Sequence, residues 1–306
     1  MKKNINNKLF IEGRLYQYDL SIKTVQNKES KNYGTEFISG TLDIATDEEG
    51  LNVISVHYTY VTPVTGNGKT NFTYTLLKQI HDGGKAWVTD GKDEAMKLRL
   101  TPALALNDFY NANGELVAAK RNEGGFVSVV RGELSPIEQR NRFDFDMVIT
   151  RVTHVDATEN YEEYLKIGGA IFDFRGALLP VELVCRMPAA FNYFDSIEAS
   201  AKNPVFTQVK GAIVSTTIQH KIEEPSAFGT VLVRTVPRNI KEYAIDWVRP
   251  VEYEFGYEDT ITAEELKKAM QDREVYLADV KKRHDEYLAS RNNSTAAPVV
   301  TEDFNF

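Results

Sequence analysis

The amino-acid sequence predicts a mainly β protein with a minor helical part: two small β-barrels, a C-terminal helix and a disordered tail. Three observations predict this class. Runs of alternating apolar and polar residues, rich in β-branched and aromatic types, recur between residues 9 and 255 and are typical of strands. The order of these runs is similar in the two halves of that region. A strongly helical segment and a polar terminus follow, and the terminus carries too little apolar surface to fold alone.

The first domain is predicted over residues 8–157. Its first strand spans Leu9 to Thr24, where alternate residues are apolar or aromatic, and two further strands follow at 35–45 and 51–61. Later strands are predicted at 96–106, 125–132 and 143–155. Strands therefore make up most of this domain.

One segment of the first domain allows two interpretations. The residues Phe72, Leu76, Leu77 and Ile80 recur at helical spacing before a Gly-Gly pair, and we favour a short helix. A strand is the alternative, because Asn67-Gly68 is a hairpin signal and Phe72, Tyr74 and Leu76 alternate.

An acidic stretch, Glu159 to Glu163, marks the expected boundary, and the second domain is predicted over residues 165–257. Strand-like runs occupy 168–187, 205–222, 231–236 and 243–255, with a helix expected at 189–201. Two short segments of the first half are similar to segments of the second half. Residues Gly13 to Asp19 are similar to Gly169 to Arg175, and residues Gly40 to Ile44 are similar to Gly211 to Ser215. Together with the strand order they favour two five-stranded barrels of the oligonucleotide-binding type.

The C-terminal helix is predicted over residues 261–290, ahead of a flexible tail at 291–306. Thr262-Ala-Glu-Glu265 is a capping box that starts the helix. One face carries an apolar stripe that must dock on the body or on another copy, so the sequence also allows a homo-oligomer. The members of this stripe are Leu266, Met270, Leu277, Val280, His284 and Leu288.

No motif predicts catalysis, a metal or a cofactor. The five histidines are scattered without ligand spacing, and no second cysteine accompanies Cys185 to complete a zinc site. Gly66 to Thr70 lacks the earlier glycine of a phosphate loop, and no serine lies in a nucleophile-elbow pattern. We therefore expect a protein that is not an enzyme. An enzyme built on a β scaffold stays a rival that only a cofactor, metal or substrate pocket would support.

The composition limits the partners. A net charge of −8 argues against coating duplex nucleic acid with a broad basic face, but it is compatible with a local basic cleft. The lone cysteine favours a reducing compartment, and neither a signal peptide nor an apolar run of about 20 residues is found. We therefore expect a cytoplasmic protein without a membrane partner.

Aromatic and basic residues are the candidates for binding, since rings can stack on bases and cations can contact phosphates. Each ring on a strand is individually more typical of core, so the hypothesis needs only a few of them to face outward. In the first half the candidates are Tyr16, Tyr18, Tyr58, Tyr60, Lys120, Arg121, Phe126, Arg131, Arg140 and Arg142, with Arg151 nearby. In the second half they are Phe172, Phe174 and Arg175.

The chain ends in Glu302, Asp303, Phe304, Asn305 and Phe306. Barrel-like strands, a spacer and an acidic terminus with a final Phe resemble the single-stranded DNA-binding proteins of bacteria and their phages, with a phage-type style of sequence. The resemblance implies oligonucleotide-binding barrels that hold single-stranded DNA without sequence preference. It also implies a tip that docks on other proteins, with Glu302 and Asp303 matching the acidic run and Phe306 the terminal anchor. Phe304 stands where the family has a smaller apolar residue.

The expected function is sequence-independent binding of single-stranded DNA in phage DNA replication or recombination. On this hypothesis the tail residues Glu302, Asp303, Phe304 and Phe306 recruit replication or recombination proteins, and a phage-encoded protein would act in the host cytoplasm. The main alternative is a β-rich phage virion or assembly protein, in which the barrels and the helix make subunit contacts.

Overall fold

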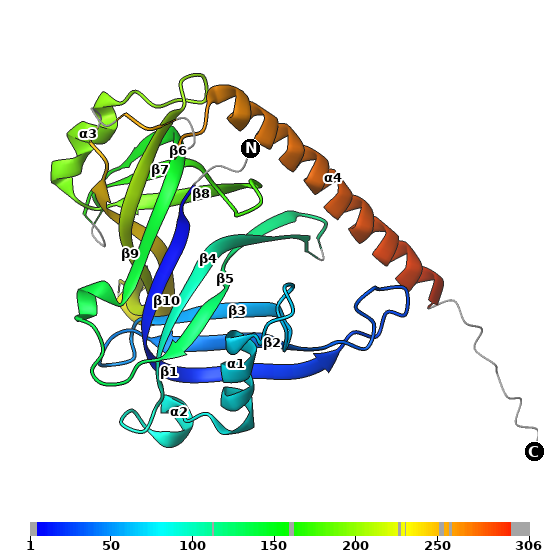
Figure 1. The fold of residues 1–306 in the computed structure, drawn as a ribbon. Coiled ribbons are helices and arrows are strands. Elements are labelled where there is room, and N and C mark those ends of the chain that lie inside the picture. The colour runs from blue at the N-terminus through cyan, green and yellow to red at the C-terminus, as the bar shows by residue number, and fades with distance from the viewer. Residues whose placement is uncertain are drawn as a thin grey trace, which may run out of the picture.

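The structure is a computed structural model in which two five-stranded barrels stand one above the other and a long helix runs along both (Figure 1). It describes residues 5–111, 113–158, 162–225, 228–229, 231–250, 254–256 and 259–294. Of residues 216–225, 231–239 and 291–294 it describes the backbone.

The first barrel consists of β1 to β5, in the order β2-β3-β5-β4-β1, with β1 pairing again with β2 to close the ring. The pairing of β3 with β5 is parallel and the other pairings are antiparallel. This is the closed Greek-key arrangement of an oligonucleotide-binding barrel. Its strands are β1 (Asn7–Thr24), β2 (Glu36–Ala45), β3 (Val53–Val61), β4 (Lys97–Tyr110) and β5 (Leu116–Val129).

Two helices, α1 (Phe72–Gly83) and α2 (Trp87–Asp90), connect β3 to β4. The segment that allowed a helix or a strand is therefore a helix. Asn71 caps its start by accepting a hydrogen bond from the Thr73 backbone N–H at 3.1 Å, and Leu77 and Ile80 are buried in the core. Helical spacing prevails over alternation here because it places both of these side chains on the barrel side.

The second barrel repeats the same plan. Its strand order is β6-β7-β8-β10-β9, β6 pairs again with β9, and β8 with β10 is the parallel pair. A short 3₁₀ helix, η1 (Ile137–Gln139), precedes it, and η2 (Pro188–Ala190) and α3 (Phe191–Ser196) follow β8. Its strands are β6 (Asn141–Val155), β7 (Tyr164–Phe172), β8 (Leu178–Cys185), β9 (Val205–Pro225) and β10 (Val231–Val248). The prediction of two barrels of this type is confirmed.

The division between the barrels lies one strand earlier than residues 157–165. The strand β6, expected in the first domain, pairs with β7 and β9 along most of its length. Only its first residues pair with the beginning of β1, where Asn7 to Ile11 join the two barrels into one ten-stranded sheet. The alternation of apolar and polar residues along β6 could not show to which barrel the strand belongs, because its apolar face could be buried equally well in either barrel.

The short sequence likenesses between the halves fall on strands that are not equivalent. Gly13 is in the first strand of its barrel, whereas Gly169 is in the second strand of the other. The equivalent pair is Gly40 and Gly169: a Cβ at either would stand 2.0 Å from a carbonyl oxygen of the preceding strand, of Asp19 or of Val148. Both positions require glycine because the second strand of each barrel crosses the first at close range.

The helix α4 (Ala263–Ser294) holds the two barrels from one side (Figure 1). The predicted capping box is present: the Glu265 N–H donates to Thr262 Oγ1 at 3.2 Å, and the Thr262 N–H donates to Glu265 Oε2 at 2.9 Å. Leu266 is buried against the second barrel, and Leu277, Val280 and His284 are half-buried. Met270 and Leu288, predicted in the same stripe, are exposed.

Arg273 explains why the stripe is incomplete. Its guanidinium faces the body and pairs with Asp108 of β4 at 2.8 Å, so a charged side chain takes a central position on the buried face of α4.

Among the described residues, none of the helices is long and apolar enough to cross a membrane.

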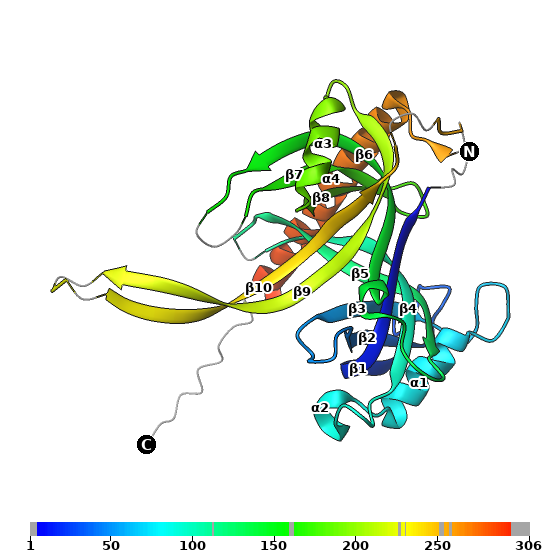
Figure 2. The same ribbon diagram turned by 90° about the vertical axis from the view of Figure 1, so that its left-hand side faces the viewer.

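The ladder between β9 and β10 continues well past their pairings with β6 and β8. Figure 2 shows it as a two-stranded ribbon that projects from the body. Its base, at residues 213–215 and 241–243, lies beside the first barrel.

Candidate nucleic-acid interface

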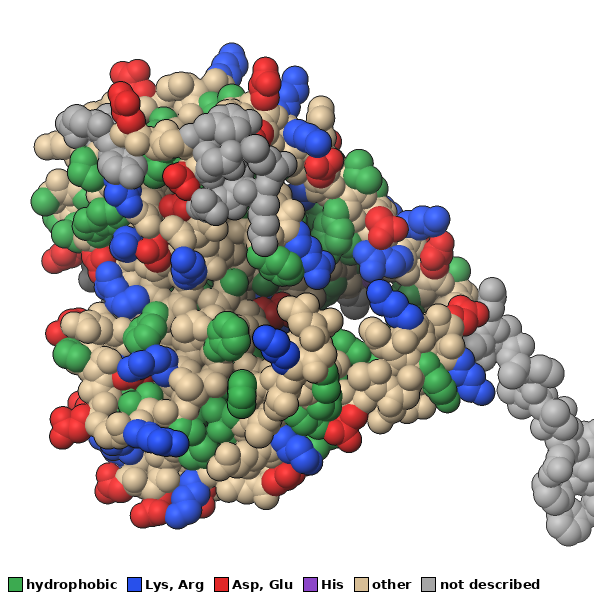
Figure 3. Space-filling view, viewed as in Figure 1, with side chains coloured by type: hydrophobic (Ala, Val, Ile, Leu, Met, Phe, Trp, Pro, Cys, Tyr) green, Lys and Arg blue, Asp and Glu red, His purple; other side chains and the backbone are tan. Residues whose placement is uncertain are grey.

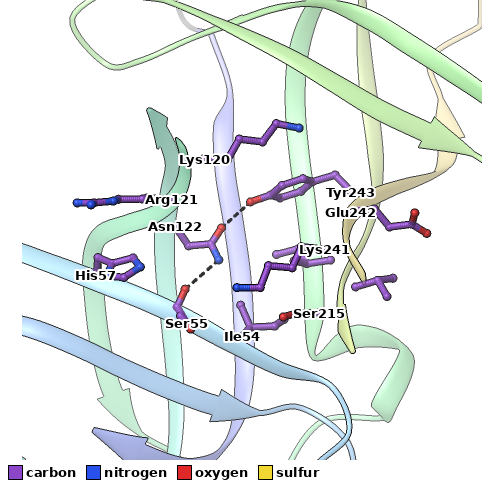
Figure 4. A pocket seen from close by; sticks show the side chains of 12 residues that line it. Ile54, Ser55, His57, Lys120, Arg121, Asn122, Ser215, Lys241, Glu242 and Tyr243 are labelled. Carbon is purple, nitrogen blue, oxygen red and sulfur yellow. Dashed lines mark hydrogen bonds between the residues drawn. The ribbon is translucent and has the colours of Figure 1, made fainter. Parts of the chain in front are cut away.

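A cavity of about 430 Å³ lies between the two barrels, and we call it the inter-barrel cleft. It is formed by β3 and β5 of the first barrel and by β9 and β10 at the base of the projecting ribbon (Figure 4). Its polar lining residues are Ser55, His57, Lys120, Arg121, Asn122, Ser215, Lys241, Glu242 and Tyr243.

Hydrogen bonds between the barrels, and one within the first barrel, fix the shape of the cleft. The Tyr243 hydroxyl donates to Asn122 Oδ1 at 2.6 Å, and Asn122 Nδ2 donates to the Ser55 carbonyl at 3.0 Å (Figure 4). At the base of the ribbon, the Ser215 N–H donates to Asn52 Oδ1 at 2.7 Å. These bonds tie β9 and β10 to the first barrel, so the cleft is built into the fold.

The cleft brings together cations from both barrels. Lys120 and Arg121 come from β5 and Lys241 comes from β10. Burial lowers the pKa of the His57 imidazole, and Arg121 and Lys241 lower it further, against the opposing effect of Asp43 and Glu123. Three cations, together with the Glu242 carboxylate, thus lie around one cavity in a chain whose net charge is −8.

The outer face of β2 and β3 adjoins the cleft and carries an aromatic pair. The rings of Phe37 and Tyr60 lie 4.7 Å apart, and the Tyr60 side chain is 44% exposed. Thr41 Oγ1 and His57 Nδ1 lie 3.0 Å apart, which connects this face with the cleft. The pair can present an aromatic surface to a base whose phosphate is held by the cations.

The second barrel adds a similar combination on the outer face of β7 and β8. The Arg186 guanidinium lies 4.5 Å from the centre of the Tyr164 ring and forms an ion pair with Glu242 of β10 at 2.9 Å. On the same face, Arg151 and Lys166 both contact Glu182. Cations and rings thus occur on both sides of the cleft, in the pattern that binds a flexible polynucleotide by phosphate contacts and base stacking.

Of the residues predicted to bind nucleic acid, three lie at or beside the cleft: Lys120 and Arg121 line it, and Tyr60 lies on the adjoining face. Two others have no outward surface, since Tyr58 is 2% exposed and Phe172 is also buried. Tyr58 and Tyr60 share the spacing of one strand face, but β3 has an extra residue where Thr59 and Tyr60 lie opposite Ser39 of β2, and this bulge lets Tyr60 turn outward.

The remaining tyrosines and two of the predicted arginines make structural contacts. Tyr16 packs against Trp87 with ring centroids 5.9 Å apart, and Tyr18 packs against the core of the first barrel. Arg140 is buried and bonds to the Glu48 carboxylate at 2.7 Å. Arg142 forms a bidentate pair with Asp246.

The other predicted residues lie away from the cleft. Phe126 is 77% exposed, but it follows the Gly124-Gly125 bulge on the part of β5 beyond the cleft, and Arg131 follows the end of that strand. Phe174 and Arg175 lie in the turn between β7 and β8, where Arg175 lines a second cavity, of about 550 Å³, beside α4. The tail residues Glu302, Asp303, Phe304 and Phe306 lie outside the described residues.

Several residues of the candidate site were not predicted from the sequence. His57, Asn122 and Lys241 line the cleft, and Phe37, Tyr164 and Arg186 lie on the outer faces beside it. No spacing links Lys241 to Lys120, because the two residues are brought together only by the docking of the barrels. The Phe37 and Tyr60 pair could have been found by treating aromatic residues on neighbouring strands as candidates for one face.

Comparison with known proteins gives one family. A family model described as YorF matches residues 6–283. No curated protein matches the chain significantly.

Among solved structures, the chain is similar to the wild-type single-stranded DNA-binding protein from Thermus aquaticus. The identity is 13% and the TM-score 0.48, over 82% of this chain and 96% of that one. A deletion mutant of that protein is similar at 12% identity and the same TM-score of 0.48, over 85% of this chain and 100% of the other. These likenesses concern the arrangement of the chain and identify no residue of the cleft.

Proposed function

The chain belongs to the YorF family, and we propose that it binds single-stranded DNA, without sequence preference, in the inter-barrel cleft. The observation that carries the proposal is the convergence of Lys120, Arg121 and Lys241 from two oligonucleotide-binding barrels on one cavity. Barrels of this type bind oligonucleotides on the face of their second and third strands, and β3 lines this cavity.

The shape and charge of the molecule favour a single strand over a duplex. The inter-barrel cleft is a local cavity of about 430 Å³, and the face seen in Figure 3 mixes Lys and Arg with Asp and Glu over both barrels. A duplex needs a broad basic surface, whereas a single strand can bend into a cleft and stack its bases. The exposed ring of Tyr60 supplies such a stacking surface.

The test is the affinity for oligo-dT of about 30 nucleotides, long enough for two barrels at roughly 4–16 nucleotides each, compared with duplex DNA of the same length. We expect tight binding of the single strand and weak binding of the duplex. Fluorescence anisotropy titrations at several salt concentrations measure both. Equal affinity for the two, or no affinity for either, contradicts the proposal, and a large assembly without affinity for DNA favours a structural or assembly role.

Variants of the cleft locate the site. We expect the double variant Arg121→Ala, Lys241→Ala to bind oligo-dT at least about tenfold more weakly, with a salt dependence reduced by about 0.7 per lost phosphate contact. The matched control is Lys78→Ala, Lys282→Ala, which removes two cations from exposed helical pairs elsewhere. A similar loss in the control would mean that total charge, rather than the cleft, governs binding.

The C-terminal tail is proposed to recruit partner proteins through Glu302, Asp303, Phe304 and Phe306. A terminal ring beside carboxylates fits an apolar pocket rimmed by cations, which provides both affinity and a fast association rate. Removal of residues 301–306 is expected to leave oligo-dT affinity unchanged or higher and to abolish capture of a replication or recombination protein. A marked loss of oligo-dT affinity would contradict this division of roles.

The wider setting is part of the same proposal: phage DNA replication or recombination, in the host cytoplasm. The support is the resemblance of the barrel-like strand order and the acidic, Phe-terminated end to single-stranded DNA-binding proteins of bacteria and their phages, together with a phage-type style of sequence. Fractionation of infected cells and recovery of the protein on replicating phage DNA would test it. Recovery with mature virions instead would favour the structural alternative.

A further inference from the structure

Glu182, on the second barrel, is contacted by cations from three strands, two at its carboxylate and one at its backbone carbonyl. Arg151 of β6 contacts Glu182 with Nη2 3.0 Å from Oε2, and Lys166 of β7 contacts it with Nζ 3.2 Å from Oε1. Lys120 of β5, in the first barrel, donates its Nζ hydrogen bond to the Glu182 carbonyl at 3.0 Å. Three positive groups therefore surround one residue on the outer face of β8.

The backbone is shaped to hold this cluster, which we call the Glu182 cluster. Gly168 is the register partner of Glu182, and the Arg151 guanidinium lies over it: a Cβ there would stand 3.2 Å from both Nε and Nη2. The register shift between Ile149 and Arg151 in β6 accompanies this placement. The absence of a side chain at Gly168 leaves room for the guanidinium on the face of the sheet.

The cluster contains a guanidinium and an ammonium, the two cations that bind phosphate in proteins, with a carboxylate between them. A guanidinium and an ammonium that converge on two carboxylate oxygens can bind two oxygens of a phosphodiester in the same way. The side chains are open to solvent, with Glu182 39% and Arg151 63% exposed, so a strand can reach them. Exposed ion pairs contribute little to folding, and displacement of the carboxylate therefore costs little.

The cluster is also continuous with the inter-barrel cleft, because Lys120 belongs to both. The Arg186 and Tyr164 pair lies further along the same face of β7 and β8. We propose that Arg151, Lys166 and Lys120 form a second phosphate site on the path of the strand, in which the Glu182 carboxylate takes the place of a phosphate until DNA displaces it. The inference rests on the proposed binding of single-stranded DNA. It assigns Glu182 a restraining role, in which its carboxylate competes with a DNA phosphate and so lowers the affinity for DNA.

The test compares Glu182→Gln with the wild type in titrations with oligo-dT of about 30 nucleotides. Glutamine keeps the size of the side chain and removes its charge. We expect affinity to rise roughly threefold to tenfold and the salt dependence to steepen by about 0.7, because one more phosphate contact releases its counterion without competition. The matched control is Glu94→Gln, which removes a carboxylate paired with Lys85 near α2 and should change neither quantity.

A second pair of measurements separates the cluster from the cleft. The double variant Arg151→Ala, Lys166→Ala is expected to weaken binding of the long oligo-dT while an oligo-dT of about 8 nucleotides, which fits one barrel, binds as to the wild type. If wild-type protein binds oligo-dT but Glu182→Gln binds with unchanged or lower affinity, the restraining role is overturned and the proposed function stands. If the wild type does not bind, both are overturned.

Discussion

The Tyr243 hydroxyl of the second barrel donates a hydrogen bond of 2.6 Å to Asn122 Oδ1 of the first. The Tyr243 ring packs against two rings of β6, with its centroid 5.8 Å from that of Phe143 and 5.9 Å from that of Phe145. Burial raises the pKa of the Tyr243 hydroxyl, which therefore stays protonated as a donor over the whole neutral range. This bond couples the orientation of the barrels to the inter-barrel cleft.

We expect Tyr243→Phe to lower the free energy of unfolding by about 1 kcal/mol, the usual net contribution of one buried hydrogen bond. Urea unfolding measures the change. Asn122→Ala and the double variant complete a mutant cycle, in which the two losses should be less than additive because they remove the same bond. Full additivity would mean that the barrels are oriented by other contacts.

The ion pair between Arg273 and Asp108 should dominate the docking of α4. The Asp108 side chain is 2% exposed, so Arg273→Ala would leave a buried carboxylate without its cation, at a cost of about 3–5 kcal/mol in the free energy of unfolding. The control is Arg283→Ala, whose partner Asp279 is exposed on the same helix and whose loss should cost about 0.5 kcal/mol or less. Equal effects of the two variants would contradict the buried role of Arg273.

The buried carboxyl of Asp146 should make the stability of the fold depend on pH. Burial raises the pKa of its carboxyl to about 6, although the Asn6 N–H donates to Oδ2 at 2.7 Å. An acid whose folded pKa is raised costs stability when charged, so the folded state gains stability as pH falls through about 6 towards the unfolded value.

We expect Asp146→Asn to be more stable than the wild type at pH 8, by at most about 3 kcal/mol at about 1.4 kcal/mol per pKa unit. The amide oxygen can still accept from Asn6. The difference should shrink as the pH is lowered to about 4, which urea unfolding at several pH values will show. A difference that is independent of pH would mean that Asp146 is charged in both states.

The carboxylate of Glu48 should have the opposite effect, so that stability is lost as the pH falls. Its hydrogen bonds to Arg140 and Lys92 lower the pKa of the carboxyl to about 2. A depressed folded pKa contributes stability above the unfolded value near 4.5, and that contribution is lost as pH falls towards about 2. Glu48→Gln should therefore be less stable than the wild type at pH 7 and should approach it in acid. A wild-type acid transition that the variant leaves unchanged would contradict this.

Tyr60 and Phe126 give a direct comparison of two exposed rings. Tyr60→Ala should weaken binding of oligo-dT by about 1–3 kcal/mol, the contribution of one stacked base, because its ring lies beside the inter-barrel cleft. Phe126→Ala removes a more exposed ring away from the cleft and should leave affinity unchanged. Both are measured by anisotropy titration on folded protein. If Phe126→Ala weakens binding and Tyr60→Ala does not, the DNA binds on the part of the first barrel that carries Phe126 and not beside the inter-barrel cleft.

Local features of this fold could be predicted because their causes lie within a few residues. The capping box at Thr262 and Glu265 forms as predicted, since both partners lie in one helical turn. The helix at Phe72 to Gly83 follows from its spacing and from the cap at Asn71. The doubling of the barrel was also predicted, although the glycine pairs used for it lie on strands that are not equivalent.

The candidate site could be predicted only in part. Alternation along a strand shows that neighbouring side chains point in opposite directions, but it does not show which set faces the core. Tyr58 and Tyr60, two residues apart, therefore could not be distinguished before the bulge in their own strand, β3, was known. Arg140 looked like a phosphate ligand until Glu48, 92 residues away, proved to be its partner.

The sequence by itself determined that this protein is mainly β, that it has two barrels and a C-terminal helix, and that Lys120 and Arg121 are candidates for binding. The tertiary structure alone decided that Lys241 joins them, that β6 belongs to the second barrel, and that Glu182 is placed among three cations. The physical reason is distance along the chain. Secondary structure depends on neighbouring residues, whereas a charged cleft depends on how two separately closed barrels dock.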